Sequence, residues 1–464
     1  MGNILPRNNN SGQVQSQNNN SGQVQSPKYN SRQIFNSDVN NCMSTIFNFD
    51  THQILGIILN FIENSEKEVN IQVKTTGNNK ETIRKDLRER LYNGIIKYLK
   101  SIDKSRIGNK INEGAYGAIY DINKSNPKED SKVLKIPLAD EQDFLLEVIS
   151  MIVYQCYKKQ IMQYVPYTTN FRWPFPTIYS CSKLYAKKKY RMCIEIERVQ
   201  TDCWSLTPPA INSDPSRSGS VLNPRHPNNP NNSNNPFDPS NFNTYEYTIT
   251  AYMSVLVQVT IALHGLQSAI YFTHRDLHAG NVMINYEKHN TTNEYILAGE
   301  KIPITSNIKT YIIDLGQSCA AISKCLEQCD RSAFIEAPGS SYDFEAYGQN
   351  SIDGCFKLGY DLRLFAGSLS YYYLYYQFNL DNMASNDMRN FARQHWQKFT
   401  PLDILMVKIY IYAYDNVVID PNADVVWHNL YTVIYKKEQR DNIFKPALFF
   451  KFLANFGNHN IYRI

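Results

Sequence analysis

The spacing of hydrophobic and polar positions changes several times along the chain, and each change marks a different predicted element. Residues 48–63 and 82–103 carry apolar side chains at helical spacing, which predicts two amphipathic helices. Residues 69–73, between them, predict a short polar strand. The apolar positions of the second helix fall largely on one face, at Leu87, Leu91, Ile95, Ile96, Tyr98 and Leu99. We therefore expect a helical extension over residues 44–104 that packs against the segment after it.

Residues 105–464 show strand patterns first and helix patterns afterwards. Strand patterns begin at residue 107 and return at 133–136 and, as two strands, within 171–199, with an apolar helix at 144–149. The second half predicts a long helix, one further strand and more helices, at 245–272, 310–316, 402–414 and 444–455. Strands gathered before helices predict an α+β fold.

Three segments depart from these patterns. Residues 1–43 contain two nearly identical polar decapeptides, 8–17 and 18–27, so we expect a disordered low-complexity tail. Residues 207–244 are rich in Pro, Asn and Ser and predict a loop inserted at the surface. Residues 286–309 are a second insertion, which would lengthen a hairpin.

Composition and charge restrict the classes of function. The net charge is +5, without a long block of like charges, so we expect no nucleic-acid partner. Nine scattered cysteines fit a reducing compartment better than a disulfide framework, so we expect an intracellular protein that is not secreted. No run reaches the roughly 18 apolar residues of a membrane helix, and we expect no membrane span. The oligomeric state stays open.

Candidate chemistry begins at the polar loop 274–281, His-Arg-Asp-Leu-His-Ala-Gly-Asn, which lies between two apolar segments. Functional groups are often placed on such loops. The carboxylate of Asp276 suits acceptance of a hydroxyl proton, and the amide oxygen of Asn281 suits a magnesium ion. The alternative is a polar turn held by a buried Arg–Asp pair.

A second candidate is the segment 111–119, Ile-Asn-Glu-Gly-Ala-Tyr-Gly-Ala-Ile, which predicts a strand, a tight turn and another strand. Gly114 and Gly117 would let backbone amides approach phosphate oxygens, because no side chain stands in the way. Ile119 is placed to cover an adenine ring. Taken alone, the two glycines also fit a plain hairpin turn.

Two further charged positions lie in apolar surroundings. Lys135 is in the middle of a predicted strand and needs a counter-charge, because an unpaired buried cation is very costly. Glu147, on the apolar helix that follows, is its natural partner. A purely structural salt bridge would use the same residues. Asp314 ends a strand just before Gly316 and could bridge a metal to phosphates, although a turn aspartate is the alternative.

The order of these features resembles the eukaryotic-type protein kinase family over residues 105–370. The matching features are, in order, the glycine turn, Lys135, Glu147, the His-Arg-Asp loop with Asn281, and Asp314. The resemblance implies a two-lobed fold with a small antiparallel-sheet N-lobe and a mainly helical C-lobe. The N-lobe would be residues 105–206, the inserted loop 207–244 and the C-lobe 245–464.

The resemblance also implies ATP- and Mg²⁺-dependent transfer of the γ-phosphate to a serine or threonine hydroxyl of a protein substrate. Asp276 would be the base, Lys135 would hold the donor phosphates and pair with Glu147, and Asn281 and Asp314 would hold magnesium. Asp361 would brace the catalytic loop. The ATP-binding residues would be Lys135 and the glycine turn, which comprises Ile111, Asn112, Glu113, Gly114, Ala115, Tyr116, Gly117, Ala118 and Ile119.

The finer features are similar to serine/threonine kinases of giant DNA viruses, yet four positions differ from the family pattern, among them Leu315, where the family carries phenylalanine. Asn112 replaces the first glycine, and residues 337–339 are Ala-Pro-Gly instead of Ala-Pro-Glu. His278 stands where serine/threonine kinases usually carry a lysine. A histidine at this position is similar to small-molecule kinases of the aminoglycoside and choline type, and also to haspin-like kinases. A small-molecule phosphotransferase and a nucleotide-binding pseudokinase scaffold are therefore the alternative hypotheses.

Overall fold

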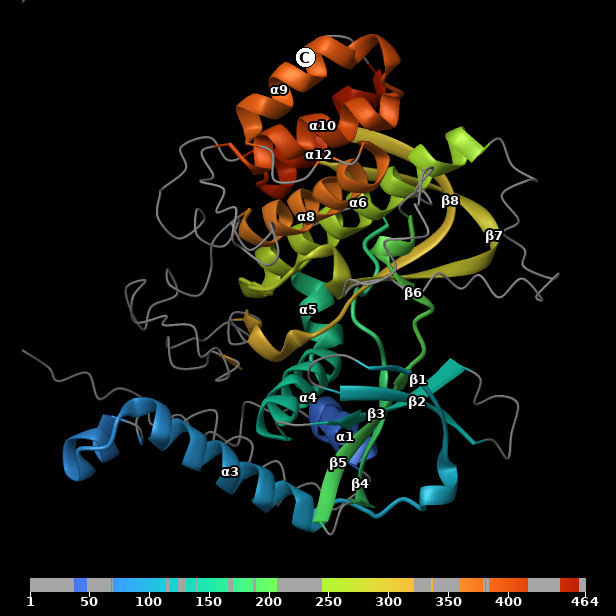
Figure 1. The fold of residues 1–464 in the computed structure, drawn as a ribbon. Coiled ribbons are helices and arrows are strands. Elements are labelled where there is room, and N and C mark those ends of the chain that lie inside the picture. Colours follow the sequence, from blue (N-terminus) through green and yellow to red (C-terminus); the bar gives the residue numbers. More distant parts are fainter. Residues whose placement is uncertain are drawn as a thin grey trace, which may run out of the picture.

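The computed structural model (Figure 1) describes the larger part of the chain and gives it an α+β architecture. The described residues are 37–47, 68, 70–113, 117–123, 131–138, 141–165, 170–186, 189–206, 244–320, 335–336, 359–378, 380, 384–415 and 443–458.

An antiparallel sheet of five strands forms one part of the molecule, with the order β1-β2-β3-β5-β4. These strands are β1 (Ile107–Glu113), β2 (Gly117–Ile122), β3 (Lys132–Pro137), β4 (Ile178–Ala186) and β5 (Lys189–Glu197). Two helices follow β3, namely α4 (Glu141–Cys156) and α5 (Lys158–Tyr164). The predicted strands at the glycine turn, around Lys135 and within 171–199 are all present.

Helices dominate the other part of the molecule, where Figure 1 shows them gathered at the end opposite the sheet. They are α6 (Thr244–Ile270), α8 (Tyr360–Phe378), α9 (Ser385–His395), α10 (Pro401–Ala413) and α12 (Pro446–Asn458). A capping box at Thr400 and Asp403 starts α10, satisfying two backbone amides that would otherwise lack partners. The helices predicted at 245–272, 402–414 and 444–455 are confirmed.

Two smaller sheets and several 3-10 turns complete the fold. A three-stranded sheet has the order β6-β7-β8, and β9 (Cys319–Ala320) pairs with β10 (Ile335–Glu336). Strands β7 (Val282–Leu297) and β8 (Glu300–Ile312) make the lengthened hairpin predicted for 286–309, and β6 (Thr201–Asp202) pairs with the start of β7. The 3-10 turns are η2 (Lys104–Arg106), η4 (Cys203–Leu206), η7 (Ala279–Asn281), η8 (Leu315–Gln317) and η11 (Trp396–Lys398).

Helix α6 is the one helix among the described residues whose length and apolar composition would allow it to cross a membrane, over Ile249–Ile270. In the structure, 72% of this window is buried inside the protein. Val255, Val259 and Leu263 are fully buried in the main core, so α6 is apolar because other elements of the chain surround it. The structure therefore gives no clear membrane span.

The N-terminal extension packs into this main core as well. Helix α1 (Ser37–Phe47) buries Met43, Ile46 and Phe47, and α3 (Lys80–Tyr98) buries Leu91 and Ile95. At the end of α3, the Lys183 ammonium donates to the carbonyls of Ile96 (3.1 Å) and Lys97 (3.2 Å). A cation at this end of a helix complements both the helix dipole and the unpaired carbonyls. The extension therefore belongs to the fold it precedes.

Three interpretations of the N-terminal region need correction. Helix α1 begins at Ser37, inside the tail predicted over 1–43, because its apolar face finds a core to pack against. Residues 70–76 are helical where 69–73 predicted a strand, with the Thr75 hydroxyl donating to the Ile71 carbonyl one helical turn earlier. Cys42 and Cys156 form a disulfide, which the expectation of reduced cysteines did not foresee.

Other sequence predictions fall outside the described residues. They are most of the tail and of the inserted loop 207–244, the helix at 48–63 and the Ala-Pro-Gly segment 337–339.

Replacing Ile95 by Ala tests whether the extension shares the main core. Ile95 is fully buried, so the substitution should lower the free energy of unfolding by about 2–5 kcal/mol in chemical denaturation. The matched control is Asn93→Ala on the exposed face of the same helix, which should change stability by less than about 0.5 kcal/mol. Equally small effects of both substitutions would show that the extension folds apart from the core.

Candidate active site

A buried ion pair joins the sheet to helix α4. The Lys135 ammonium lies 2.6 Å and 2.7 Å from the two carboxylate oxygens of Glu147, which is the partner that the sequence predicted. The two side chains are only 17% and 4% exposed. Burial raises the pKa of Glu147, and the nearby Lys135 charge opposes this effect. The ion pair therefore fixes the position of α4 relative to strand β3.

Gly117 brings strand β2 close to this ion pair. A Cβ atom at Gly117 would lie 3.3 Å from Cε of Lys135 and 3.2 Å from the Ile136 carbonyl oxygen. Both contacts are tighter than side chains normally make, so a larger residue would push against the stem of Lys135. The glycine thus has a packing role beside the backbone role predicted for it.

The polar loop 274–281 lies between α6 and β7, as predicted, and its residues bond to one another. The Asn281 side-chain amide donates to the backbone carbonyl of Asp276 (2.8 Å). Because the nitrogen is used here, the Asn281 side-chain oxygen is the atom that can accept a metal. His278 caps the turn η7 by accepting the Gly280 amide at Nδ1 (3.1 Å). Asp276 is only half-buried, so solvent or substrate can reach this residue.

His274 links this loop to the strand end that carries Asp314. Its Nε2 lies 2.7 Å from the Ile313 carbonyl oxygen, and its Nδ1 accepts the Asp276 amide at 3.3 Å. Complete burial lowers the pKa of His274 to about 4. The ring is therefore neutral near pH 7, with its proton on Nε2, where it donates to Ile313.

Asp314 occupies a strained backbone conformation at the entrance to η8. Its φ and ψ angles are 61° and 63°, the left-handed region that costs a non-glycine residue of order 1 kcal/mol or more. Burial raises the pKa of Asp314, Lys135 opposes the rise, and the Asp276 carboxylate adds to it. Asp314 also raises the pKa of Glu147. Four charged groups from β3, α4, the polar loop and η8 thus lie within electrostatic range of one another.

Asp361 holds the polar loop from the helical part. At the start of α8, its two oxygens accept the backbone amides of His274 (2.8 Å) and Arg275 (2.9 Å), as predicted for a brace. Burial raises the pKa of Asp361 to about 7, against the effect of these two amides. The loop backbone is therefore tied to α8 on one side and to Ile313 on the other.

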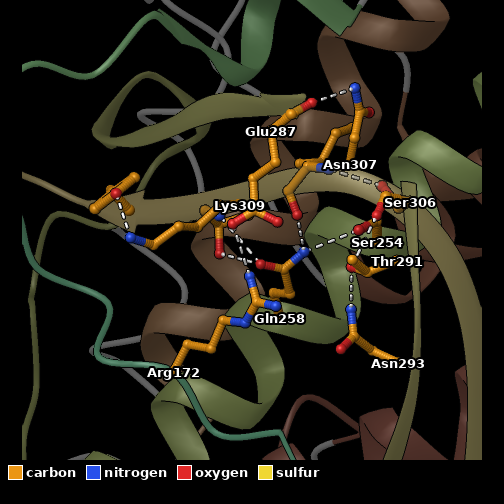
Figure 2. A network of polar contacts seen from close by, with 12 residues as sticks. Arg172, Ser254, Gln258, Glu287, Thr291, Asn293, Ser306, Asn307 and Lys309 are labelled. Atoms are coloured by element: carbon orange, nitrogen blue, oxygen red, sulfur yellow. Dashed lines mark hydrogen bonds and ion pairs between the residues drawn. The ribbon is translucent and has the colours of Figure 1, made fainter. Parts of the chain in front are cut away.

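Gln258 positions strand β8, which leads to Asp314, and was not predicted from the sequence (Figure 2). Its side-chain nitrogen donates to the Ile308 carbonyl (2.8 Å) and to the Ser254 hydroxyl (2.9 Å). Its oxygen accepts the Thr310 amide (3.1 Å) and hydroxyl (3.3 Å). Both the nitrogen and the oxygen of this buried side-chain amide are hydrogen-bonded. Gln258 therefore fixes strand β8 to α6 in a defined position.

The predicted glycine turn is only partly described. Gly114, Ala115 and Tyr116 lie outside the described residues. The strands beside them pair Asn112 with Ile119 and Glu113 with Ala118. Ala118 is buried and Ile119 packs against the main core, whereas Ile111, Asn112 and Glu113 are exposed.

Magnesium is the metal that the predicted donors suit. Within the described residues, no group of three or more His, Cys, Asp or Glu side chains could hold a metal ion. Asn281 and Asp314 offer one amide and one carboxylate oxygen, and Mg²⁺ is usually held by one or two such ligands while water and phosphate complete its octahedron. These are hard oxygen donors, and the carboxylate of Asp276 adds negative charge near Asp314. Such surroundings fit a magnesium ion that is also bound by a phosphate group.

Comparison with known proteins adds no family to this description. No model of a protein family matches the chain, and no curated protein matches it in sequence.

The buried neutral His274 predicts a pH dependence of stability. In the unfolded chain its pKa returns to 6.5, whereas in the folded protein it is about 4. Between these values the unfolded state binds more protons, so acidification lowers the free energy of unfolding, by about 3 kcal/mol in total. The contribution is complete above pH 6.5 and is lost as the pH falls towards 4.

Urea unfolding of wild type and His274→Gln across this pH range measures the effect. The variant should lose this slope, because glutamine can still donate to the Ile313 carbonyl but does not titrate. Asp361 acts in the opposite direction between pH 3.8 and about 7, so the wild type must be compared with the variant at each pH. Exposed His289→Gln controls for the loss of one histidine. An unchanged slope in His274→Gln would contradict the prediction.

Proposed function

We propose that the chain is an ATP- and Mg²⁺-dependent phosphotransferase of the protein-kinase type, with a serine or threonine hydroxyl of a protein as acceptor. One observation carries this proposal, namely that the buried Lys135–Glu147 pair, Asp314 and Asp276 act electrostatically on one another. These groups come from distant parts of the chain. In this proposal the five-stranded sheet belongs to an N-lobe and the main helices to a C-lobe.

The donor nucleotide would bind beside the sheet. The Lys135 ammonium supplies the positive charge for the phosphates, and Glu147 keeps its stem in place. Gly117 leaves room at strand β2 for this lysine, and the backbone of the glycine turn would lie over the phosphates. Asn281 and Asp314 would hold Mg²⁺, which neutralises charge that develops on the transferred phosphoryl group.

Transfer requires a positioned base and an acceptor hydroxyl. The hydroxyl oxygen forms a bond to the γ-phosphorus while the bond from that phosphorus to the β–γ bridging oxygen breaks, and ADP leaves. Asp276 accepts the hydroxyl proton. Its backbone is held by His274, whose Nδ1 accepts the Asp276 amide (3.3 Å), and by Asn281 (2.8 Å). This rigid support matters because the base must be aligned with the hydroxyl to be effective.

A protein acceptor is favoured by two features of the site. Small-molecule kinases of the aminoglycoside and choline type usually lack an arginine where Arg275 stands and a glycine turn of this form. In this chain the backbone of Arg275 is fixed in the polar loop, because its amide donates to Asp361 and its carbonyl accepts the Tyr360 hydroxyl (3.0 Å). His278 is the feature that favours the small-molecule alternative.

Asp276→Asn tests the assigned base. Purified protein with Mg²⁺, labelled ATP and generic acceptors such as casein, histone or myelin basic protein should transfer phosphate. The variant should lose about 10²–10⁴-fold in rate, because the amide cannot accept the proton. Asp387→Asn, at an exposed position of α9, is the matched control and should keep the wild-type rate.

The outcomes separate the three hypotheses. Equal rates for wild type and Asp276→Asn would show that the mechanism is wrong. Transfer to an aminoglycoside or choline, but to no protein, would support a small-molecule kinase. Thermal stabilisation by Mg-ATP without any transfer would support a pseudokinase scaffold.

Asn281→Ala tests the metal assignment separately. The variant keeps Asp314 but loses one oxygen donor, so the Mg²⁺ concentration for half-maximal rate should rise by about tenfold or more. The measurement is a Mg²⁺ titration of phosphotransfer at saturating ATP. Asn290→Ala, at an exposed position of β7, is the control. An unchanged Mg²⁺ requirement in Asn281→Ala would remove Asn281 from the metal site.

A further inference from the structure

The disulfide between Cys42 and Cys156 joins the N-terminal extension to the helix that carries Glu147. Cys42 lies in α1, and Cys156 is the last residue of α4. Their Cα atoms are 5.5 Å apart, across 114 residues of sequence. The cross-link therefore connects a distant segment of the chain to a helix of the candidate active site.

Besides the disulfide, a buried apolar face and an ion pair to α5 hold α1 against the rest of the fold. Met43, Ile46 and Phe47 give the short helix a buried apolar face. Lys159 and Asp38 add an ion pair at 3.2 Å, with side chains that are 75% and 57% exposed. Such exposed pairs contribute little. Since isolated helices of this length are marginal, α1 depends on its buried face and on the disulfide, and the disulfide is the covalent link to α4.

Helix α4 has two contacts with the site that depend on its position. Glu147 binds Lys135 through both carboxylate oxygens. Farther along the same helix, the buried Tyr154 hydroxyl lies 3.1 Å from the Ser318 hydroxyl. Ser318 donates in turn to the Leu315 carbonyl (2.8 Å) in the turn that follows Asp314. A shift of α4 therefore disturbs both the ion pair and the metal-binding turn.

We propose that the Cys42–Cys156 disulfide is a redox-sensitive clamp that holds α4 in the position required by the Lys135–Glu147 pair. Opening the clamp lowers phosphotransfer, a consequence that rests on the proposed function. A disulfide that links an added helix to a site-bearing helix suits a redox sensor, because opening it removes a restraint on the helix that carries Glu147.

The chemistry of opening needs a cellular dithiol or two monothiols as reductant. A reductant thiolate attacks Sγ of Cys42, which is partly exposed, and Cys156, which is only 6% exposed, leaves as a thiolate and takes up a proton. A second reductant thiolate then attacks the mixed disulfide and releases Cys42. The reductant becomes a disulfide and gives two electrons, and the protein gains two thiols.

Three other cysteines do not compete for this chemistry. Cys181, Cys193 and Cys203 are free and buried. Burial raises the pKa of each thiol, for Cys193 to about 12. They remain protonated and shielded, and the thiolate is the reactive form. Of these five cysteines, only Cys42 and Cys156 are thus expected to respond to a reductant.

The test compares the full chain before and after mild reduction by dithiothreitol. Mass spectrometry of an unreduced digest should find the Cys42–Cys156 peptide pair, and reduction should remove it. Amide hydrogen exchange in residues 141–156 should then accelerate by about tenfold or more. Phosphotransfer should fall by a similar factor. Cys42→Ser should show the reduced behaviour in both conditions, and Cys181→Ala should respond as wild type does.

The measurements separate the clamp from the proposed function. Faster exchange in α4 on reduction, in a protein that transfers no phosphate, supports the clamp and contradicts the function. If the protein transfers phosphate but reduction changes neither the transfer rate nor the amide exchange of α4, the clamp is overturned and the proposed function is unaffected. Absence of the cross-linked peptide from protein purified without reductant also overturns the clamp.

Discussion

Lys135 and Glu147 are buried opposite charges, and each needs the other because an unpaired buried charge is very unfavourable. The geometry of the candidate site follows from this requirement. Removing one partner of a buried ion pair typically costs about 3–5 kcal/mol, because the remaining charge has no compensation. Strand β3 must therefore keep a fixed position relative to α4. Strands β2 and β5 hold β3 from both sides, while α1 and α3 contact α4. The extension thus supports the charge pair indirectly.

The second half of the site is held by hydrogen bonds to the backbone. Asp361 accepts two amides of the polar loop, and neutral His274 joins that loop to Ile313, the residue before Asp314. Gln258 fixes the strand that leads there. Because each of these groups is buried and satisfied, moving one requires moving its partners. The loop and the Asp314 turn therefore behave as one unit, with half-buried Asp276 on it.

Much of this arrangement could be predicted from local sequence. Strand and helix patterns identified β1 to β5, α6, α10 and α12, because periodic burial leaves a periodic sequence. The pairing of Lys135 with Glu147 could be predicted because an apolar strand cannot bury a lone cation. Short-range patterns were wrong at residues 69–73, since strand propensity depends strongly on the surroundings. They were also wrong for residues 37–43, whose apolar face finds a partner only in the folded protein.

The sequence by itself therefore determined the order of elements and the residues able to carry charge, bind metal or accept a proton. Apart from the Lys135–Glu147 pair and the Asp361 brace, only the tertiary structure decided which of these residues meet. The Cys42–Cys156 bond and the support of β8 by Gln258 both join segments that are distant in the sequence. Local periodicity carries no information about such distances, because contacts of this kind depend on how whole elements pack against one another.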